Sequence, residues 1–418
     1  MTQPLVSIDP HDREILRALA ARVREIAELP EMAARKKRLT RHNGLDPERP
    51  LILCYPEGAW SELVPDSQLE CKTFRNWEYA LRSKIYWWEH IRDDHVLEPY
   101  FDMAWRVTLG DYGVAIPRTH GENRGSYTWE PPIKDLNADF DKLKFRSIEI
   151  DREGTRQNMD LADGIFGDLL PLRMQGGYWW SMGLTNDLIS LIGLEQLMLA
   201  MLDEPEALHR LMGWMRDEHL NLITTLEKEG VLLLNNRNGY TGSGGVAYTT
   251  ELPQADWKPG APVRLIDLWG FAESQETVGV SPDMFGEFIF PYQLPILEKF
   301  GLNCYGCCES VHQRLPWIMT IPRLRRVSVS PWADQRKMAE ALGRTCIFSR
   351  KPNPAPVCVS FDEPAIRRDL RETLEIAGKG VLEIIMKDTH TVQQKPERIT
   401  RWVQVALEEV DRYMHGPS

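Results

Sequence analysis

The sequence contains no long hydrophobic run. Nowhere in its 418 residues do about 18 apolar residues follow one another, the length that a helix needs to cross a bilayer. The first residues, from Met1 to Arg13, are polar, include Pro4 and Pro10, and have no apolar core like that of a secretory signal. These absences predict a protein that does not insert into membranes and that stays in the cytoplasm.

Cysteine and basic charge are also scarce. The 7 cysteines are an odd number, and most stand singly in apolar segments, which favours free thiols over a disulfide framework. The net charge is -11, so the chain repels phosphate backbones and we expect no nucleic-acid partner. The short basic run from Arg35 to Arg38 is interpreted as a solvated helix end and not as a binding patch.

Internal repeats and low-complexity tracts are absent as well. The composition is that of a globular protein, with 43% hydrophobic and 27% charged residues. Tryptophan is abundant at 14 residues, and large aromatic side chains favour packed walls and pockets. We therefore expect a folded globular protein without disorder outside its termini.

Short apolar runs alternate with helical segments through most of the chain. The expected strands lie near residues 100–108, 169–174, 231–234, 263–268, 302–305, 325–329, 345–348 and 382–386. Helices are expected over 186–201, 205–229, 282–300 and 363–377, the third with Ser281 as N-cap and Gly301 after its end. Such alternation predicts a parallel sheet, and eight repeats predict a (β/α)8 TIM barrel of the α/β class.

The first part of the chain shows a different pattern. Residues 9–37 and 76–90 have helical spacing, and a short apolar run at 50–55 precedes a loop. We therefore expect residues 1–95 to form an N-terminal helical extension packed on the barrel, and residues 96–418 to form the barrel. The segment from about 109 to 168 is rich in Pro, Gly and charge, and is expected to be an excursion.

In this fold the active site is built from the loops that follow the carboxyl ends of the strands. Polar residues follow nearly every expected strand. The candidates for substrate binding are Asn235, Trp269, Gln275, Trp332 and Asn353, and the candidates for catalysis are Glu273, Lys351 and Asp388.

The segment from Cys304 to Glu309 has the strongest chemical character. Thiolates, imidazole and carboxylate are suitable zinc ligands, and a catalytic zinc keeps three protein ligands and one open position. We predict a metal site formed by Cys307, Cys308, Glu309 and His390. The alternative is that the thiols are small core residues, as free cysteines commonly are. That interpretation is preferred for the four isolated cysteines, which are Cys54, Cys71, Cys346 and Cys358.

Each remaining candidate has a functional and a structural interpretation. Glu273 acts as general acid or base if burial raises its pKa, or is a third metal ligand or a solvated loop acid. Lys351 and Asn353 bind a carboxylate or oxyanion, or form an ordinary turn. Asp388 orients His390, or caps a helix. The tryptophans, namely Trp179, Trp180, Trp269 and Trp332, line a wide mouth or pack in the core.

The glycine-rich segment from Asn238 to Val246 resembles a loop that cradles phosphate. It lacks a following Lys-Ser/Thr pair and does not open a helix, so a nucleotide site is not expected there. We interpret the segment as a mobile lid over the barrel mouth.

Four blocks together resemble the uroporphyrinogen decarboxylase-like superfamily, over residues 50 to 412. The blocks are Asp267-Leu-Trp-Gly, Val280-Ser-Pro-Asp-Met-Phe-Gly-Glu-Phe before Pro291-Tyr292, Tyr305-Gly-Cys-Cys-Glu309, and Lys351-Pro-Asn-Pro354. The resemblance is nearer to the zinc-dependent methyltransferases that work with corrinoid proteins than to the true decarboxylases, whose Arg-rich N-terminal signature is absent here.

The resemblance implies a methyl transfer from a small donor, of methoxylated or methylamine type, to a corrinoid protein or another acceptor. It also implies zinc, and a chain that dimerises with a second copy. The branch usually carries a His-x-Cys pair after a mid-barrel strand and another Cys after the last strand. This sequence departs from that pattern with Cys304-Tyr-Gly-Cys307-Cys308-Glu309 and Asp388-Thr-His390, so any ligand set is rearranged.

Three hypotheses remain open at this point. The first is a methyltransferase or demethylase component with stoichiometric zinc. The second is a metal-free decarboxylase or lyase that releases carbon dioxide from a carboxylated substrate. The third is a non-catalytic barrel that serves as a binding or scaffold subunit, in which substitutions at the mouth change only the affinity for a partner.

Overall fold

The structure is a computed structural model that describes residues 8–120 and 127–416. Its centre is a six-stranded parallel sheet with the strand order β1-β14-β13-β12-β11-β10. The strands are β1 (Leu51–Cys54), β10 (Trp269–Ala272), β11 (Leu302–Tyr305), β12 (Leu324–Val329), β13 (Ile347–Arg350) and β14 (Val381–Met386). Nearly every residue of these strands is buried, which explains their continuous apolar sequences.

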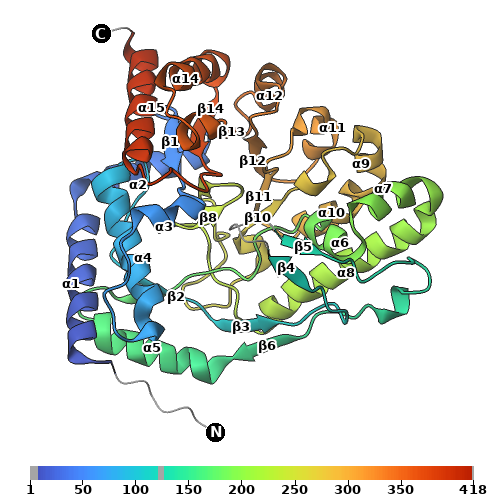
Figure 1. Cartoon of the computed structure of the whole chain (residues 1–418), viewed down its shortest axis with the longest axis horizontal. Helices are drawn as coiled ribbons and strands as arrows, with labels where there is room; N and C mark the ends of the chain where they lie inside the picture. Colours follow the sequence, from blue (N-terminus) through green and yellow to red (C-terminus); the bar gives the residue numbers. More distant parts are fainter. Residues whose placement is uncertain (1–7, 121–126, 417–418) are drawn as a thin grey trace.

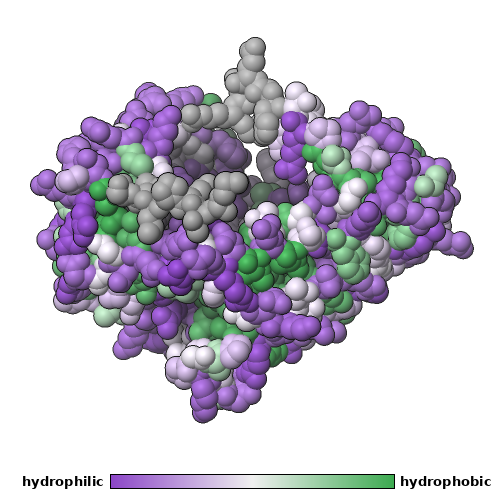
Figure 2. Space-filling view, turned by 90° about the horizontal axis from the view of Figure 1, so that it is seen from below, coloured by the Kyte–Doolittle hydropathy of each residue, from purple (hydrophilic) through white to green (hydrophobic). Residues whose placement is uncertain are grey.

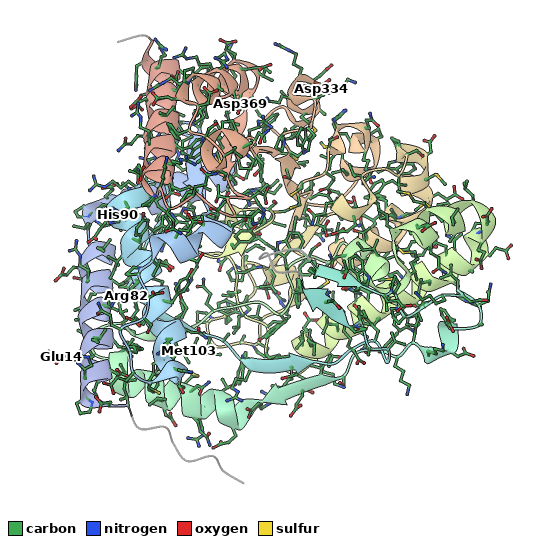
Figure 3. The ribbon with its side chains drawn as sticks, in the orientation of Figure 1. Glu14, Arg82, His90, Met103, Asp334 and Asp369 are labelled. Carbon is green, nitrogen blue, oxygen red and sulfur yellow. The ribbon has the colours of Figure 1, made fainter. Side chains whose placement is uncertain are left out.

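Helices that follow the strands cover the sheet (Figure 1). They are α9 (Pro282–Phe288), α10 (Phe290–Leu297), α11 (Leu315–Ile318), α12 (Gln335–Leu342), α13 (Ala355–Cys358), α14 (Glu363–Ala377) and α15 (Glu397–His415). Figure 3 labels Asp334 and Asp369 in this region. Asp334 caps the first turn of α12, and Asp369 accepts a 2.9 Å hydrogen bond from Arg350 at the end of β13. The cap therefore fixes the start of α12. The contact between Asp369 and Arg350 joins α14 to the sheet.

The N-terminal part contains the expected helices and one strand that was not expected there. The helices are α1 (Pro10–Ala27), α2 (Pro30–Asn43), α3 (Trp60–Leu63) and α4 (Arg75–Tyr86). Leu16, Ala20 and Val23 of α1 pack into a core shared with α4 and α5. Strand β1, however, pairs with β14 in the central sheet. Residues 1–95 are therefore not purely helical, and the division of the chain at residue 95 stays a prediction.

The middle of the chain forms small sheets beside the central one. Strands β2 (Phe101–Met103) and β7 (Leu172–Met174) pair with each other in parallel. Strands β3 (Arg106–Leu109) and β6 (Ile148–Asp151) form an antiparallel ribbon, and β4 (Arg118–His120) pairs with β5 (Tyr127–Trp129). Helix α5 (Arg152–Phe166) follows. The excursion expected between residues 109 and 168 is thus a structured ribbon and helix.

Three helices lead from this region toward the sheet. They are α6 (Thr185–Ile192), α7 (Leu194–Asp203) and α8 (Pro205–Lys228). The single helix predicted over 186–201 is wrong, because Gly193 adopts a φ of 81° and separates α6 from α7. The predicted helix over 282–300 is likewise two helices, and Pro291 lies in the first turn of the second.

The shorter elements complete the order of the chain. The one-turn helices are η1 (Glu57–Ala59), η2 (Lys72–Phe74), η4 (Phe140–Lys142), η5 (Leu265–Asp267), η6 (Gln275–Thr277) and η7 (Val311–Gln313), and η3 (Trp87–Ile91) is a π-helical turn that continues α4. Among the described residues, no helix combines the length and the apolar character that crossing a bilayer requires.

The prediction of a closed eight-stranded barrel is not confirmed. Among the described residues, the central sheet has six strands, and no hydrogen-bonded strand joins β10 to β1. The predicted strand at 231–234 is extended chain without a strand ladder, and the predicted strand at 263–268 begins only at Trp269. The side chain of Asn235 explains why residues 231–234 form no ladder with β10. Its amide donates to the C=O of Trp269 and accepts from the N–H of Trp269, so it takes the place of a backbone partner.

The glycine-rich segment, which was predicted to be a mobile lid, packs against the central sheet. It forms a short hairpin from β8 (Tyr240–Thr241) and β9 (Gly245–Val246), and residues 241–249 are buried. A side chain at Gly245 would meet the guanidinium of Arg326 at 2.4 Å, and one at Gly242 would meet Cys304 at 3.0 Å. The glycines therefore let this hairpin pack directly on the sheet.

Figure 2 views the molecule from below the orientation of Figure 1, so that the side with β6 and α5 faces the reader. Figure 2 shows apolar side chains near the middle of this face with hydrophilic ones around them. Apolar atoms contribute a large part of the surface of most folded proteins, so this pattern is ordinary.

Candidate functional site

The carboxyl ends of β10 and β11 are joined by one buried carboxylate. Glu309 accepts hydrogen bonds from the backbone N–H of Ser274 at 3.0 Å and of Cys307 at 2.8 Å. Glu273, next to Ser274, is thereby brought close to Cys307. Three of the residues predicted from sequence, Glu273, Cys307 and Glu309, thus lie together where the active site of a parallel α/β fold is expected.

Cys307 lies in an environment that favours its thiolate. Its Sγ is 3.6 Å from Sγ of Cys308, 3.2 Å from Oγ of Ser243 and 4.0 Å from Nζ of Lys387. The hydrogen bond from Cys308, and then the charge of Lys387, lower the pKa of Cys307 to about 7 against the effect of burial. The partner thiol Cys308 has a raised pKa for the same reason, since it donates that hydrogen bond. Cys307 is therefore the candidate nucleophile.

Lys387 supplies the positive charge beside this thiol. It follows β14, is buried, and donates a hydrogen bond to Oγ of Ser243 at 3.2 Å. Its Nζ lies 3.6 Å from Oε1 of Glu57. Burial opposes its charge, but the nearby Tyr240, Cys307 and Glu57 together raise the pKa of Lys387 above its ordinary value. Lys387 is thus an ammonium fixed next to Cys307.

Glu273 has the opposite character. Its side chain is 1% exposed, and burial, followed by the charges of Glu276 and Glu309, raises its pKa to about 9. The carboxyl is therefore protonated at neutral pH and is able to donate a proton. It lines a cavity of about 200 Å³ together with Trp179, Trp180 and His219.

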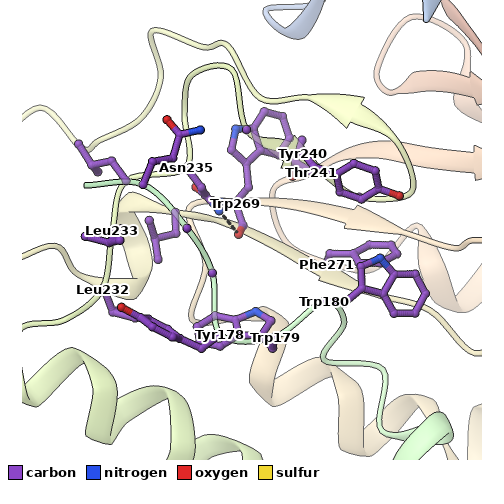
Figure 4. Close-up of a pocket in the computed structure, with 17 residues that line it drawn as sticks. Tyr178, Trp179, Trp180, Leu232, Leu233, Asn235, Tyr240, Thr241, Trp269 and Phe271 are labelled. Atoms are coloured by element: carbon purple, nitrogen blue, oxygen red, sulfur yellow. Dashed lines mark hydrogen bonds between the residues drawn. The ribbon is translucent and has the colours of Figure 1, made fainter. Parts of the chain in front are cut away.

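A larger cavity of about 550 Å³ shares the aromatic wall of the first one (Figure 4). Tyr178, Trp179 and Trp180 line both cavities. Trp269 and Phe271 of β10 form part of another wall, and Asn235 is held against Trp269 by the hydrogen bond drawn in Figure 4. Among the described residues that line the larger cavity, none is charged. Its chemistry suits a flat, uncharged molecule or a soft organic cation.

The hairpin of β8 and β9 connects this cavity to the thiol. Tyr240, Thr241 and Gly242 line the cavity, and Ser243, the next residue, contacts Sγ of Cys307. Cys307 is 2% exposed and lies behind this hairpin, outside the lining of the cavity. The cavity and the reactive thiol are therefore adjacent, with the hairpin between them.

Several predicted residues lie away from this cavity. Lys351 is buried beside the sheet, where its Nζ donates to Oγ of Ser349 at 2.6 Å, and burial lowers its pKa to about 7. Asn353 is exposed, and its side chain caps the turn at Ala355. Trp332 is 71% exposed. Gln275 hydrogen-bonds Glu273 and Glu276 without lining the larger cavity. None of these four contributes to the lining of the larger cavity.

Asp388 and His390 follow β14, as predicted, but in different environments. Asp388 adopts a φ of 59°, its backbone N–H donates to Glu57 at 2.8 Å, and its carboxylate lies 3.8 Å from Sγ of Cys308. His390 is exposed. Within the described chain no hydrogen bond joins the two side chains, so an orienting pair is not formed.

The four predicted zinc ligands do not fit a zinc site as a set. Both oxygens of Glu309 accept backbone hydrogen bonds, and His390 is exposed. In the ranges that the structure describes, no three His, Cys, Asp or Glu side chains are placed to hold a metal ion. Of the four predicted ligands, Cys307 and Cys308 bring two donor atoms together, with 3.6 Å between their sulfur atoms. A tetrahedral site needs at least one further protein ligand.

Comparisons with known proteins inform the fold. The sequence matches no known family and no curated protein. Among solved structures it is similar to a methyltransferase from Methanosarcina mazei, with a TM-score of 0.52 and 12% identity, over 91% of this chain and 99% of the other. At this identity the similarity concerns the fold, so membership of the uroporphyrinogen decarboxylase-like superfamily is not confirmed.

Sequence reasoning missed the residues that surround the thiol. Lys387 stands directly before the predicted Asp388, and Ser243 lies inside the glycine-rich segment that was interpreted as a lid. Tyr240 lies in the same segment, and Glu57 comes from η1 in the N-terminal part of the chain. The one available signal was the position of Lys387 at the end of a strand, since charged residues rarely end a buried strand without a role.

Proposed function

We propose that this protein is a methyltransferase whose larger cavity binds a small methyl donor and whose Cys307 accepts the methyl group. The single observation that carries the proposal is a thiol with a lowered pKa directly behind an uncharged aromatic cavity. The similarity in fold to a protein named as a methyltransferase supports it. An enzyme of this kind also fits an α/β fold whose described residues form a six-stranded parallel sheet.

The cavity argues against the decarboxylase alternative. A polycarboxylate buried in a cavity needs cationic partners. Moving an unpaired carboxylate out of water costs on the order of several kcal/mol of solvation free energy. The described lining residues of the larger cavity include no Arg, Lys or His. A neutral aromatic methyl ether has no such requirement, and a methylammonium group is attracted to the faces of Trp and Tyr.

The proposed reaction uses groups of the protein alone. Because the hairpin of β8 and β9 separates Cys307 from the larger cavity, the hairpin has to move aside before the thiolate sulfur reaches the methyl carbon. An S–CH3 bond then forms while the bond from carbon to the donor oxygen or nitrogen breaks. The leaving atom takes the electron pair, and a leaving oxygen takes the proton from the neutral carboxyl of Glu273. Lys387 and Ser243 hold the thiolate before the attack. The step balances without an oxidant or reductant.

The remaining parts of this function are proposals as well. A corrinoid protein, or another acceptor, would take the methyl group from Cys307. Zinc would require a ligand in addition to Cys307 and Cys308, and elemental analysis of the purified protein decides this point. Location in the cytoplasm and assembly as a homodimer are further parts of the proposal.

The first test is a survey of methyl donors. Purified protein is incubated with aromatic methyl ethers and with methylammonium compounds, and mass spectrometry follows a gain of 14 Da on the peptide that contains Cys307. We expect methylation by at least one donor, and a loss of about tenfold or more in rate for Trp180→Ala, because Trp180 forms a wall of both cavities. Methylation of other cysteines only would contradict the proposal.

The pH dependence of the reaction follows from two groups. Cys307, with a pKa of about 7, must be ionised, so the rate should rise as the pH passes about 7. Glu273, with a pKa of about 9, must be protonated to serve a leaving oxygen, so the rate should fall as the pH passes about 9. We expect a bell-shaped profile with its maximum near pH 8. Glu273→Gln should remove the alkaline limb, and a persistent limb would exclude Glu273 as the acid.

A further inference from the structure

A third cavity, which also has Tyr240 in its wall, has no role in the proposed reaction. Its wall includes Tyr55, Lys84, Trp87, His95, Asp102 and Tyr240. Its volume of about 230 Å³ is below that of typical sites for drug-sized ligands, so the cavity has room for about one substituted ring.

His95 is held in this wall by a fixed carboxylate. Its Nδ1 lies 2.7 Å from Oδ2 of Asp93, and its backbone N–H donates to Oδ1 of Asp93 at 3.0 Å. Asp93 also accepts hydrogen bonds from the backbone N–H of Cys54 at 2.7 Å and from Nε1 of Trp87 at 3.2 Å. Asp93 is thus bound to β1 and cannot turn away from the imidazole.

The second ring nitrogen of His95 has no such partner. In the tautomer whose Nδ1–H donates to the carboxylate of Asp93, Nε2 carries the lone pair and acts as an acceptor. Nε2 is buried and has no hydrogen-bond partner among the residues that the structure describes, although the ring lines the cavity. A buried acceptor without a partner destabilises the folded state, so native proteins rarely retain one without a reason.

The rest of the cavity indicates what would bind there. Tyr55 meets the imidazole edge-on at 4.7 Å between centroids, and Trp87 lies 4.1 Å from it. Tyr240 packs on Tyr55 at 5.2 Å. The charges of Lys84 and Asp102 offset each other at 3.4 Å. A flat, neutral ring suits these walls.

We propose that this cavity is a binding site for a small hydroxylated aromatic molecule, whose O–H donates a hydrogen bond to Nε2 of His95. The ring lies among Tyr55, Trp87 and Tyr240, and the hydroxyl supplies the donor that the imidazole lacks. Binding here does not depend on methyl transfer, because neither Cys307 nor Glu273 lines this cavity.

The test uses 4-fluorophenol as probe and 4-fluorotoluene, which has a methyl group in place of the hydroxyl, as matched ligand. Fluorine NMR of the intact protein measures the Kd of each. We expect His95→Phe to raise the Kd of 4-fluorophenol at least about tenfold, which corresponds to about 1.4 kcal/mol. Trp180→Ala, which alters the larger cavity, should leave that Kd unchanged. The 4-fluorotoluene should bind more weakly to the native protein and respond little to His95→Phe.

A second measurement covers the case in which His95→Phe does not fold. In the native protein with nitrogen-15-labelled histidine, addition of 4-fluorophenol should shift the Nε2 signal of His95 in a saturable way. An unshifted signal, equal affinity for 4-fluorotoluene, or a Kd that responds to Trp180→Ala and not to His95→Phe would overturn the proposal. The experiment involves no turnover, so its failure would leave the proposed methyl transfer untouched.

Discussion

Cys307→Ser is expected to reduce methyl transfer by at least about 1,000-fold. A serine hydroxyl is far less acidic than a thiol, so it stays protonated beside Lys387 and attacks the methyl carbon poorly; loss of a nucleophile in other enzymes costs up to about 10⁶ in kcat. The measurement is the initial rate of demethylation of the best donor found in the survey.

Cys358→Ser is the matched control for this variant. Cys358 lies on α13, far from the thiol site in the chain, and burial raises its pKa. We expect it to leave the rate unchanged. Thiol alkylation of the folded protein provides an independent readout, because the rate of alkylation of Cys307 should fall as the pH drops below about 7, where the reactive thiolate becomes protonated. Retention of most of the rate in Cys307→Ser would remove the proposed nucleophile.

Arg326→Leu is expected to lower the free energy of unfolding by about 3–5 kcal/mol. Arg326 on β12 and Glu383 on β14 are 1% and 0% exposed, and Nε of the arginine lies 2.7 Å from Oε1 of the carboxylate. Nη2 of Arg326 also donates to Oδ1 of Asn43 at 2.7 Å, which joins α2 to the sheet. Removing the arginine leaves the carboxylate of Glu383 buried in the sheet without its main partner. Breaking a buried ion pair in this way typically costs about 3–5 kcal/mol of folding free energy.

Urea unfolding followed by circular dichroism measures this effect. Arg156→Ala serves as control, because Arg156 pairs with Glu153 on the exposed face of α5, and no measurable loss is expected. The double variant Arg326→Leu/Glu383→Leu should recover part of the loss, since it removes both charges. A loss below about 1 kcal/mol for Arg326→Leu would show that water or other groups compensate the buried charge.

The same pair affects the candidate site. Gly245 packs on the guanidinium of Arg326, and Ser243 in that hairpin contacts Cys307. Arg326→Leu should therefore also move Ser243 and slow the alkylation of Cys307. The pair and the thiol are thus coupled through one short hairpin.

Parts of the fold were predictable because their signals are local. The strand at 302–305 was predicted with its observed bounds, and the helix at 363–377 likewise, since an apolar run after Gly301 and the Asp362 cap mark them. The placement of Glu273 and Cys307 after neighbouring strands was predicted for the same reason. Gly193 and Pro291 break two of the predicted helices, and both are local signals that the sequence itself contains.

Other features depend on contacts between distant parts of the chain. Strand β1 joins β14 across about 330 residues of sequence, and Asn235 replaces a strand partner of Trp269 with its side chain. The amino-acid order by itself determined where buried strands and capped helices form and which polar residues end them. Only the tertiary structure decided that Ser243 and Lys387 meet Cys307, because a thiol's acidity depends on charges and donors within a few ångströms, whatever their distance along the chain.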